Sequence, residues 1–281
     1  MTVREALMEA TGRLRAAGVE APWLDAELLL ARALDTDRTG LYREPERVLT
    51  RTEQDRLEQT LLRRQAREPM AYISGRREFW GLDMAVTPAV LVPRPETELL
   101  VEEALKAVGS RTREVLILDL CTGSGCVAVA LACGLPRARV VATDLSAEAL
   151  AVARTNARTH GVAERVAFRQ GDLWEPVEDL AGRIDVVTAN PPYIPTSRIG
   201  ALAPEVSRYE PSVALDGGQD GLAVIRRIVE EAWRFLRPGG ILLMEVGEEG
   251  IPPLPALERY RSMAVSPDLS GTPRVVRLER A

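Results

Sequence analysis

Residues 1 to about 70 carry apolar side chains at helical spacing and show no alternating strand pattern. The apolar positions mark three helices: Leu7, Ala10 and Leu14 on the first, Leu24, Leu28 and Leu29 on the second, and Leu57, Leu61 and Leu62 on the third. Amphipathic helices without a strand bury their apolar faces against one another. We therefore predict a helical bundle over residues 1–73 as a candidate for substrate recognition; a purely stabilising role is the alternative.

Capping signals mark the ends of these helices. Thr2 and Glu5 have the spacing of a capping box, in which each side chain bonds the backbone N–H of the other residue. Thr50 and Glu53 repeat this spacing at a later helix. Gly18 can end the first helix in a left-handed turn, because glycine adopts positive φ without steric cost.

The pattern changes after the bundle to short β-type runs. Gly75, Gly81 and Pro88 separate these runs, which is typical of hairpin strands and turns. Pro95 and Glu96 then have the composition of a helix start. We predict a β-hairpin linker over residues 74–96.

From Val115 onward, the chain alternates apolar strands with helical stretches. The strand candidates are EVLILDL, ARVVATDL, RVAFRQGDL, IDVVTANPPY and GGILLMEVG, and the tail adds two strands joined by a turn at residues 268–271. Continuous apolar strands separated by helices favour a parallel sheet covered on both faces. We predict an α/β domain over residues 97–281, with a doubly wound, mostly parallel, seven-stranded sheet that binds ligands along its carboxyl edge.

Composition narrows the class of protein. The 281 residues are 46% hydrophobic and 27% charged, which is typical of a globular chain. The net charge of −5 includes no basic tail or stripe, so counterion release on a nucleic acid is not the expected driving force for binding. The apolar runs are too short for a transmembrane helix, and the N-terminus has no signal core, so we expect a cytoplasmic protein.

Three cysteines, Cys121, Cys126 and Cys133, lie close together in the sequence. Their spacing fits neither a CxxC pair nor a zinc pattern, and an odd number is a poor disulfide framework. We expect buried thiols and no metal site.

Polar or glycine-rich loops follow successive strands. Gly123 and Gly125 allow a tight turn and a close approach of the backbone to a ligand at the start of the next helix; alone, the loop could be an ordinary turn. Asp144 ends the next strand, where a carboxylate can accept hydrogen bonds from ribose hydroxyls. Asp172 follows the third strand, where it can accept from an adenine amino group while Leu173 packs on the ring.

The fourth strand delivers Asn190, Pro191, Pro192 and Tyr193. The Asn190 side-chain oxygen and the Pro191 carbonyl are two acceptors on a stiff backbone, suited to grip a planar –NH₂. Tyr193 offers a face for stacking. Such a grip aims the nitrogen lone pair at an electrophile, so catalysis needs positioning and desolvation rather than a strong base.

These motifs resemble the class I S-adenosyl-L-methionine-dependent methyltransferases with a Rossmann-like fold. NPPY is shared by adenine-N6 DNA methyltransferases and protein-glutamine-N5 methyltransferases. The segments PMAYISGRREFWGL, VLVPRPETE, RYEPSVALDGGQDGL, RPGGILLMEVG and DLSGTPRVV resemble the release factor glutamine methyltransferase (HemK/PrmC) family over nearly the full length.

The resemblance implies the cofactor S-adenosyl-L-methionine and a set of site residues. Cys121, Thr122, Gly123, Ser124 and Gly125 would wrap the methionine part, Asp144 would hold the ribose, Asp172 and Leu173 the adenine, and Asn190 both methyl donor and substrate amide, with Pro191, Pro192 and Tyr193 completing the amide pocket. Cys121 stands where the family usually has the first glycine, so a side chain occupies the point of closest backbone approach, while Gly123 and Gly125 remain.

The resemblance also implies the substrate: the glutamine of the Gly-Gly-Gln motif in peptide chain release factors 1 and 2. We expect a monomer without direct nucleic-acid or membrane partners. Adenine-N6 methylation of DNA, glutamine methylation of a ribosomal protein, and a non-catalytic cofactor-binding adaptor are the alternatives. A DNA enzyme would need a basic surface able to flip a base, and residues 1 to about 70 supply none.

Overall fold

The computed structural model describes residues 1–110, 112–247 and 255–281. They form two compact units, one of Met1–Ser74 with Ala203–Tyr209, and one of Gly75–Leu202 with Glu210–Ala281. The inclusion of residues 203–209 in the first unit is a long-range feature that the local sequence pattern did not predict.

The first unit is helical, as the spacing of its apolar residues predicted. Its helices are α1 (Val3–Ala16), α2 (Pro22–Ala33), α3 (Arg38–Arg43), α4 (Arg51–Gln65), α5 (Met70–Ser74) and the distant α10 (Pro204–Ser207). The two capping boxes are confirmed, at Thr2 for α1 and at Thr50 for α4. Gly18 follows α1 at a φ of 74°, in the predicted left-handed turn.

The core of this unit corrects part of the predicted pattern. Leu24 and Leu28 on α2 and Leu62 on α4 are exposed, although we had grouped them with apolar faces. Helix α2 instead buries residues at spacings of three and four, namely Ala26, Leu29, Leu30 and Ala33. Three successive leucines in the segment ELLLA allow several overlapping faces, and the sequence alone does not show which of them meets α1 and α4.

Ion pairs hold α10 within the helical unit. Glu205 accepts hydrogen bonds from Arg64 at 2.9 Å and from Arg67 at 2.5 Å. Arg64 is buried and also bonds Asp25 at 2.7 Å. A buried guanidinium needs such partners, because an unpaired charge out of water is costly.

A short hairpin begins the second unit. Its strands β1 (Arg76–Phe79) and β2 (Leu82–Ala85) pair antiparallel through a two-residue loop, Trp80 and Gly81, both at positive φ. The hairpin thus occupies the first half of the predicted linker. A 3₁₀ turn at Pro95–Thr97 then leads into α6 (Glu98–Val108).

The second unit contains the predicted seven-stranded sheet. Its strands are β3 (Leu116–Leu120), β4 (Arg139–Asp144), β5 (Val166–Gln170), β6 (Ile184–Ala189), β7 (Leu236–Glu245), β8 (Tyr260–Pro267) and β9 (Pro273–Arg280), in the spatial order β5-β4-β3-β6-β7-β9-β8. Strands β3 to β7 are parallel, and β9 pairs antiparallel with β7 and β8. The chain runs outward from β3 through β4 and β5 and then resumes at β6, so the switch point lies between β3 and β6.

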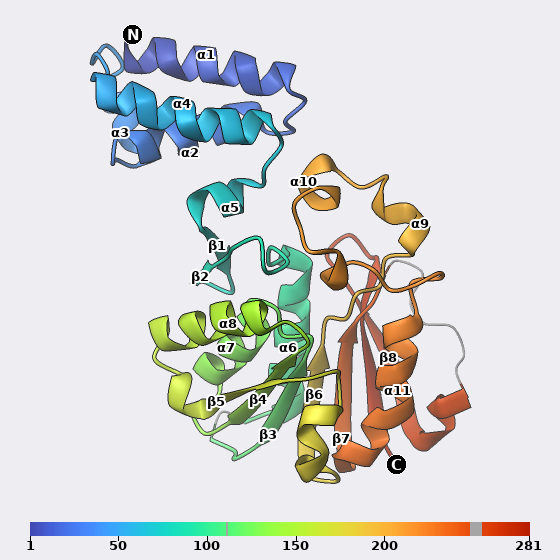
Figure 1. The fold of residues 1–281 in the computed structure, drawn as a ribbon. Helices are drawn as coiled ribbons and strands as arrows, with labels where there is room; N and C mark the ends of the chain where they lie inside the picture. The colour runs from blue at the N-terminus through green and yellow to red at the C-terminus, as the bar shows by residue number, and fades with distance from the viewer. Residues whose placement is uncertain (111, 248–254) are drawn as a thin grey trace. The chain divides into compact units, whose positions relative to one another are not determined.

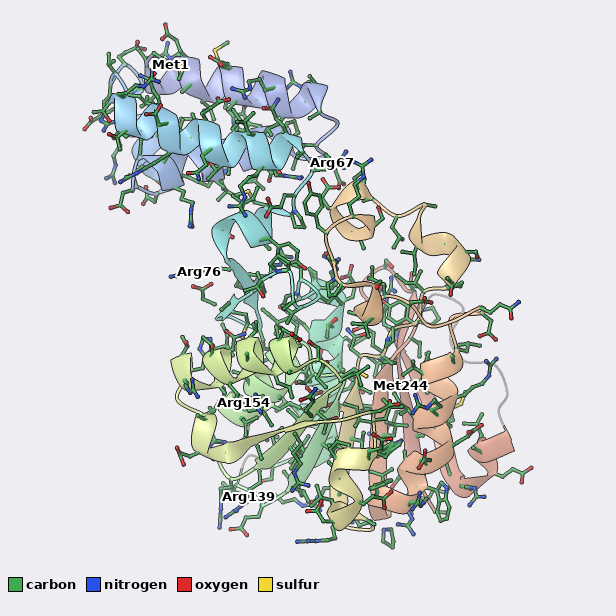
Figure 2. All side chains as sticks on the ribbon, viewed as in Figure 1. Met1, Arg67, Arg76, Arg139, Arg154 and Met244 are labelled. Atoms are coloured by element: carbon green, nitrogen blue, oxygen red, sulfur yellow. The ribbon has the colours of Figure 1, made fainter. Side chains whose placement is uncertain are left out.

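Helices cover both faces of this sheet (Figure 1). Helices α6, α7 (Cys126–Gly134) and α8 (Ala147–Thr159) pack on one face, and α11 (Ala223–Phe235) packs on the other. The short helix α9 (Thr196–Ile199) follows β6. Met244 on β7 lies inside the unit, whereas Arg139 marks the amino-terminal edge of the sheet (Figure 2). This doubly wound arrangement confirms the predicted fold class.

Helix α7 is apolar around its whole circumference. It is buried between the sheet and the neighbouring helices, so no polar face is needed. Across the described residues, no helix combines the length and the apolar composition required to cross a bilayer.

The cysteines correct one expectation. Cys126 is buried at the start of α7 and Cys121 is half-buried, but Cys133 near the end of α7 is exposed. The three thiols are free.

Asn156 on α8 links the hairpin to the loop after β3. Its Oδ1 accepts the Ala85 N–H at 2.8 Å, and its Nδ2 donates to the Ala85 carbonyl at 3.0 Å and to the Ser124 carbonyl at 2.8 Å. The side chain is fully buried. It supplies the backbone N–H and carbonyl of Ala85 with the hydrogen bonds that a neighbouring strand would otherwise make.

Replacing Asn156 tests this link. Asn156→Ala leaves one backbone N–H and two carbonyls without their side-chain partner, and we expect the free energy of unfolding to fall by about 3 kcal/mol. Urea denaturation measures this change. Thr155→Ala, on the exposed side of the same helix, is the control and should cost less than about 0.5 kcal/mol. Equal losses in the two variants would contradict the role given to Asn156.

Candidate active site

A cavity of about 270 Å³ lies at the carboxyl ends of β3, β4, β5 and β6. Predicted site residues that line it are Cys121, Thr122, Gly123, Ser124, Asp144, Asp172, Leu173, Asn190 and Pro192. Gly125, Pro191 and Tyr193 are absent from its described lining. The structure therefore brings most of the predicted residues to one cavity beside the switch point, where doubly wound sheets bind ligands.

The loop after β3 turns sharply into α7. Gly123 and Gly125 have φ angles of 55° and 78°, and Gly125 is the N-cap of α7. A Cβ at Gly125 would lie only 2.9 Å from the Cβ of Ala153 on α8, so this glycine is needed for close packing as well as for its φ. Its contribution to the site is indirect, because it allows the loop to lie against α8.

Cys121 adopts a conformation that glycine adopts more easily. Its φ of 56° lies in the left-handed region, which costs a side chain roughly 1–2 kcal/mol. This explains why a glycine is usual here in the family that the sequence resembles. The Cys121 side chain packs beside the core under α11 and lines the cavity. Burial raises the pKa of the thiol, which keeps it neutral.

Asp144 is held by backbone donors. Its Oδ2 accepts the Gly123 N–H at 2.8 Å and its Oδ1 accepts the Ser146 N–H at 2.9 Å. Burial raises the pKa of this carboxyl, while these N–H bonds oppose the rise. A carboxylate oxygen accepts more than one hydrogen bond, so both oxygens keep acceptor capacity for ligand hydroxyls.

Asp172 has a partner that the sequence did not suggest. Arg227 on α11 donates to its Oδ2 at 2.8 Å, and both residues line the cavity. Leu173 follows at a φ of 49°, which turns the chain so that Trp174 is buried against Phe235. Arg227 lies 55 residues after Asp172, and no nearby sequence pattern indicates that the two side chains meet.

The segment after β6 divides its residues between the cavity and the interior. Asn190 and Pro192 line the cavity. Tyr193 is not among the lining residues, and its hydroxyl donates to Glu245 at the end of β7, at 3.2 Å. Burial, together with the nearby Glu245 carboxyl, raises the pKa of Tyr193, so the phenol stays protonated and is not a base.

A buried carboxylate, Asp119, connects the two loops. Its Oδ2 accepts the Thr122 hydroxyl at 2.6 Å, and its Oδ1 accepts the Thr188 hydroxyl at 2.7 Å. Thr122 belongs to the loop after β3, and Thr188 lies two residues before Asn190. Burial raises the pKa of Asp119 to about 6, and the two hydroxyl donors limit the rise. The sequence analysis did not predict this contact; the threonine within the apolar run VVTA is the signal that could have indicated it.

Arg94, which is partly exposed, forms an ion pair with the buried Glu210. Arg94 lines the cavity and donates to Glu210 at 2.6 Å, where the Glu210 side chain is nearly inaccessible to solvent. Burial raises the pKa of Glu210, and Arg94 opposes this effect. Glu210 therefore braces Arg94 at the cavity wall, a pairing that the sequence left open.

Curated proteins resemble this chain over almost its whole length. A release factor glutamine methyltransferase from Moorella thermoacetica is 45% identical over 278 residues, which cover 98% of this chain and 97% of the relative. One from Koribacter versatilis is 41% identical, with 98% of each chain covered. The chain belongs to the release factor glutamine methyltransferase family.

Family models match both parts of this family member. The PrmC N-terminal domain matches residues 5–75, and the methyltransferase small domain matches residues 95–202. The second range contains the loops of the cavity from Cys121 to Tyr193. This family member is a methyltransferase with S-adenosyl-L-methionine as methyl donor, and both predictions are confirmed.

A solved structure supports the fold independently. The hMettl16 catalytic domain matches 82% of this family member and 81% of its own chain, with a TM-score of 0.54 and 15% sequence identity. At this identity, the likeness shows the class I methyltransferase fold alone.

The buried Asp119 makes stability depend on pH. Its folded pKa of about 6 lies above the unfolded value near 3.8, so ionisation above pH 6 costs stability, and protonation on acidification removes that cost. From about pH 8 to about pH 5, wild type should gain roughly 1 kcal/mol of unfolding free energy relative to Asp119→Asn, which does not titrate. Denaturant titrations across this range measure the difference. A pH-independent difference would show that Asp119 keeps its ordinary pKa.

Proposed function

We propose that this protein methylates the side-chain N5 of the glutamine in the Gly-Gly-Gln motif of bacterial release factors 1 and 2. Family membership supports glutamine in a release factor as the target. The observation that supports the chemistry is that Asn190 and Pro192 line the same cavity as the glycine-rich loop and Asp144. A methyl acceptor gripped by NPPY would thus share one cavity with the methyl donor.

The residues that line the cavity fit S-adenosyl-L-methionine. Asp144 presents carboxylate oxygens for the ribose hydroxyls, and Asp172 presents one for the adenine amino group. Leu145, Leu173 and Val224 provide apolar surface for the ring. Cys121, Thr122, Gly123 and Ser124 hold the methionine part, and Gly125 allows the turn that positions them. When bound, the cofactor supplies an electrophilic methyl group on a sulfonium.

The protein's own contribution is to position the acceptor nitrogen. The Asn190 Oδ1 and the Pro191 carbonyl accept the two N–H bonds of the glutamine amide, and the Tyr193 ring bounds the amide pocket. The two prolines fix successive φ angles, so the acceptors keep their separation. A planar amide nitrogen is a poor nucleophile, and holding its two protons in place directs its lone pair toward the methyl group. Tyr193 stays protonated, and the amide proton leaves after the nitrogen becomes cationic.

We further propose that the helical unit, Met1–Ser74 with Ala203–Tyr209, recognises the release factor. Its N-terminal 70 or so residues have balanced charge, which suits a protein surface better than a phosphate backbone.

Labelled S-adenosyl-L-methionine identifies the substrate. We expect label to enter a release factor that carries Gly-Gly-Gln and to be absent from a variant with the glutamine changed to alanine. Mass spectrometry of the labelled peptide places the methyl group on N5. Duplex DNA with varied adenine contexts and ribosomal protein serve as parallel substrates. Label in DNA but not in the release factor would overturn the proposal.

Asn190→Ala tests the amide grip. Removal of one of the two acceptors should lower kcat at least about a hundredfold, because a misplaced acceptor loses its alignment. The melting temperature should stay close to that of wild type, since Asn190 is only partly buried. Turnover at the wild-type rate would exclude a role for the Asn190 side chain.

A further inference from the structure

Thr97 is a buried residue at the cavity that no sequence motif assigned to the site. It ends the 3₁₀ turn before α6, its side chain is 2% exposed, and it lines the cavity. The Asn190 Nδ2 donates to its Oγ1 at 3.1 Å, across 93 positions of sequence. Of the two ends of the Asn190 amide, the nitrogen is therefore directed at Thr97.

We propose that Thr97 is a positioning residue that sets which end of the Asn190 amide faces the substrate. The inference rests on the proposed function of Asn190 as an acceptor for the glutamine –NH₂. An asparagine amide is donor at one end and acceptor at the other. In the wrong orientation, the Asn190 –NH₂ would face the substrate –NH₂, and neither group could accept.

A hydroxyl alone cannot make this selection. Thr97 can donate as well as accept, so it could bond either end of the Asn190 amide. The selection requires that the Thr97 proton be used elsewhere. Glu245 is the acceptor proposed for this proton: its Oε1 accepts the Tyr193 hydroxyl at 3.2 Å, its buried Oε2 has no hydrogen-bond partner among the described residues, and the Thr97 side chain is near enough to lower its pKa. With its proton directed at Glu245, Thr97 offers Asn190 only a lone pair.

Glu245 is suited to this role by its surroundings. It is 1% exposed at the end of β7. Its Oε1 accepts the Tyr193 hydroxyl, while its Oε2 has no hydrogen-bond partner among the described residues. Burial raises the pKa of Glu245, and the Thr97 and Tyr193 donors favour its ionised form. One buried carboxyl thus orients residues on both sides of the amide pocket, Asn190 through Thr97 and Tyr193 directly.

Substitutions at Thr97 separate hydrogen bonding from packing. Thr97→Val keeps the shape and loses the hydroxyl, whereas Thr97→Ser keeps the hydroxyl and loses a methyl group. We expect kcat for release factor methylation to fall about tenfold in the valine variant and to stay within about twofold of wild type in the serine variant. The dissociation constant of S-adenosyl-L-methionine, from calorimetry, should change less than about twofold in both.

A second readout needs no substrate. The side-chain amide of Asn190, assigned by comparison with Asn190→Asp, should show one NMR proton protected from solvent exchange in wild type and Thr97→Ser but not in Thr97→Val. Glu245→Gln adds a donor that competes for Thr97, and should also lower kcat and reduce this protection.

The outcomes distinguish the two proposals. If wild type leaves the release factor unmethylated but the Asn190 protection depends on the Thr97 hydroxyl, the proposed substrate fails and the positioning role stands. Unchanged protection in Thr97→Val would overturn the positioning role, as would a serine variant as impaired as the valine variant.

Discussion

The cavity depends on one buried ionisable group, Asp119 at the end of the central strand β3. Its two oxygens accept hydrogen bonds from the hydroxyls of Thr122, in the loop after β3, and of Thr188 on β6. Burial disfavours the charge and raises the pKa of Asp119, so the site is stable only because both acceptor oxygens are satisfied. These two hydrogen bonds fix two segments to the same carboxyl group. One is the loop proposed to hold the methyl donor, and the other is β6, which leads into NPPY.

This constraint matters because the proposed chemistry relies on position. A methyl transfer to an amide nitrogen without a base gains its rate from alignment and from exclusion of water, and small displacements of the acceptor are costly. Asn190 donates to Thr97 in the turn before α6, and Tyr193 donates to Glu245 at the end of β7. The segment that follows β6 is therefore fixed at two points to neighbouring elements, which holds the proposed amide pocket in place.

Short sequence patterns predicted the fold and the main loops. They did not predict contacts between side chains that lie far apart in the sequence. Apolar runs, glycines and prolines act over a few residues, so the strands, the switch-point loops and NPPY could be read directly. Arg227 beside Asp172 and Asn156 beside Ala85 join positions 55 and 71 residues apart. The residues next to Arg227 and Asn156 in the sequence give no sign of these contacts. The contacts form only when α11 and α8 pack against the sheet. The roles of individual site residues toward cofactor and substrate stay predictions.

The chain downstream of NPPY leads into the helical unit and back. After Leu202 the chain enters the helical unit, where Glu205 is held by Arg64 and Arg67, and it returns at Glu210, which bonds Arg94 at the cavity. Ion pairs that are largely shielded from water therefore hold both Glu205, inside this segment, and Glu210, where the chain returns. Salt screens such pairs less than it screens pairs on the surface. Residues 194–202 connect NPPY to residues 203–209, so the helical unit that is proposed to recognise the release factor is joined to NPPY by nine residues of chain.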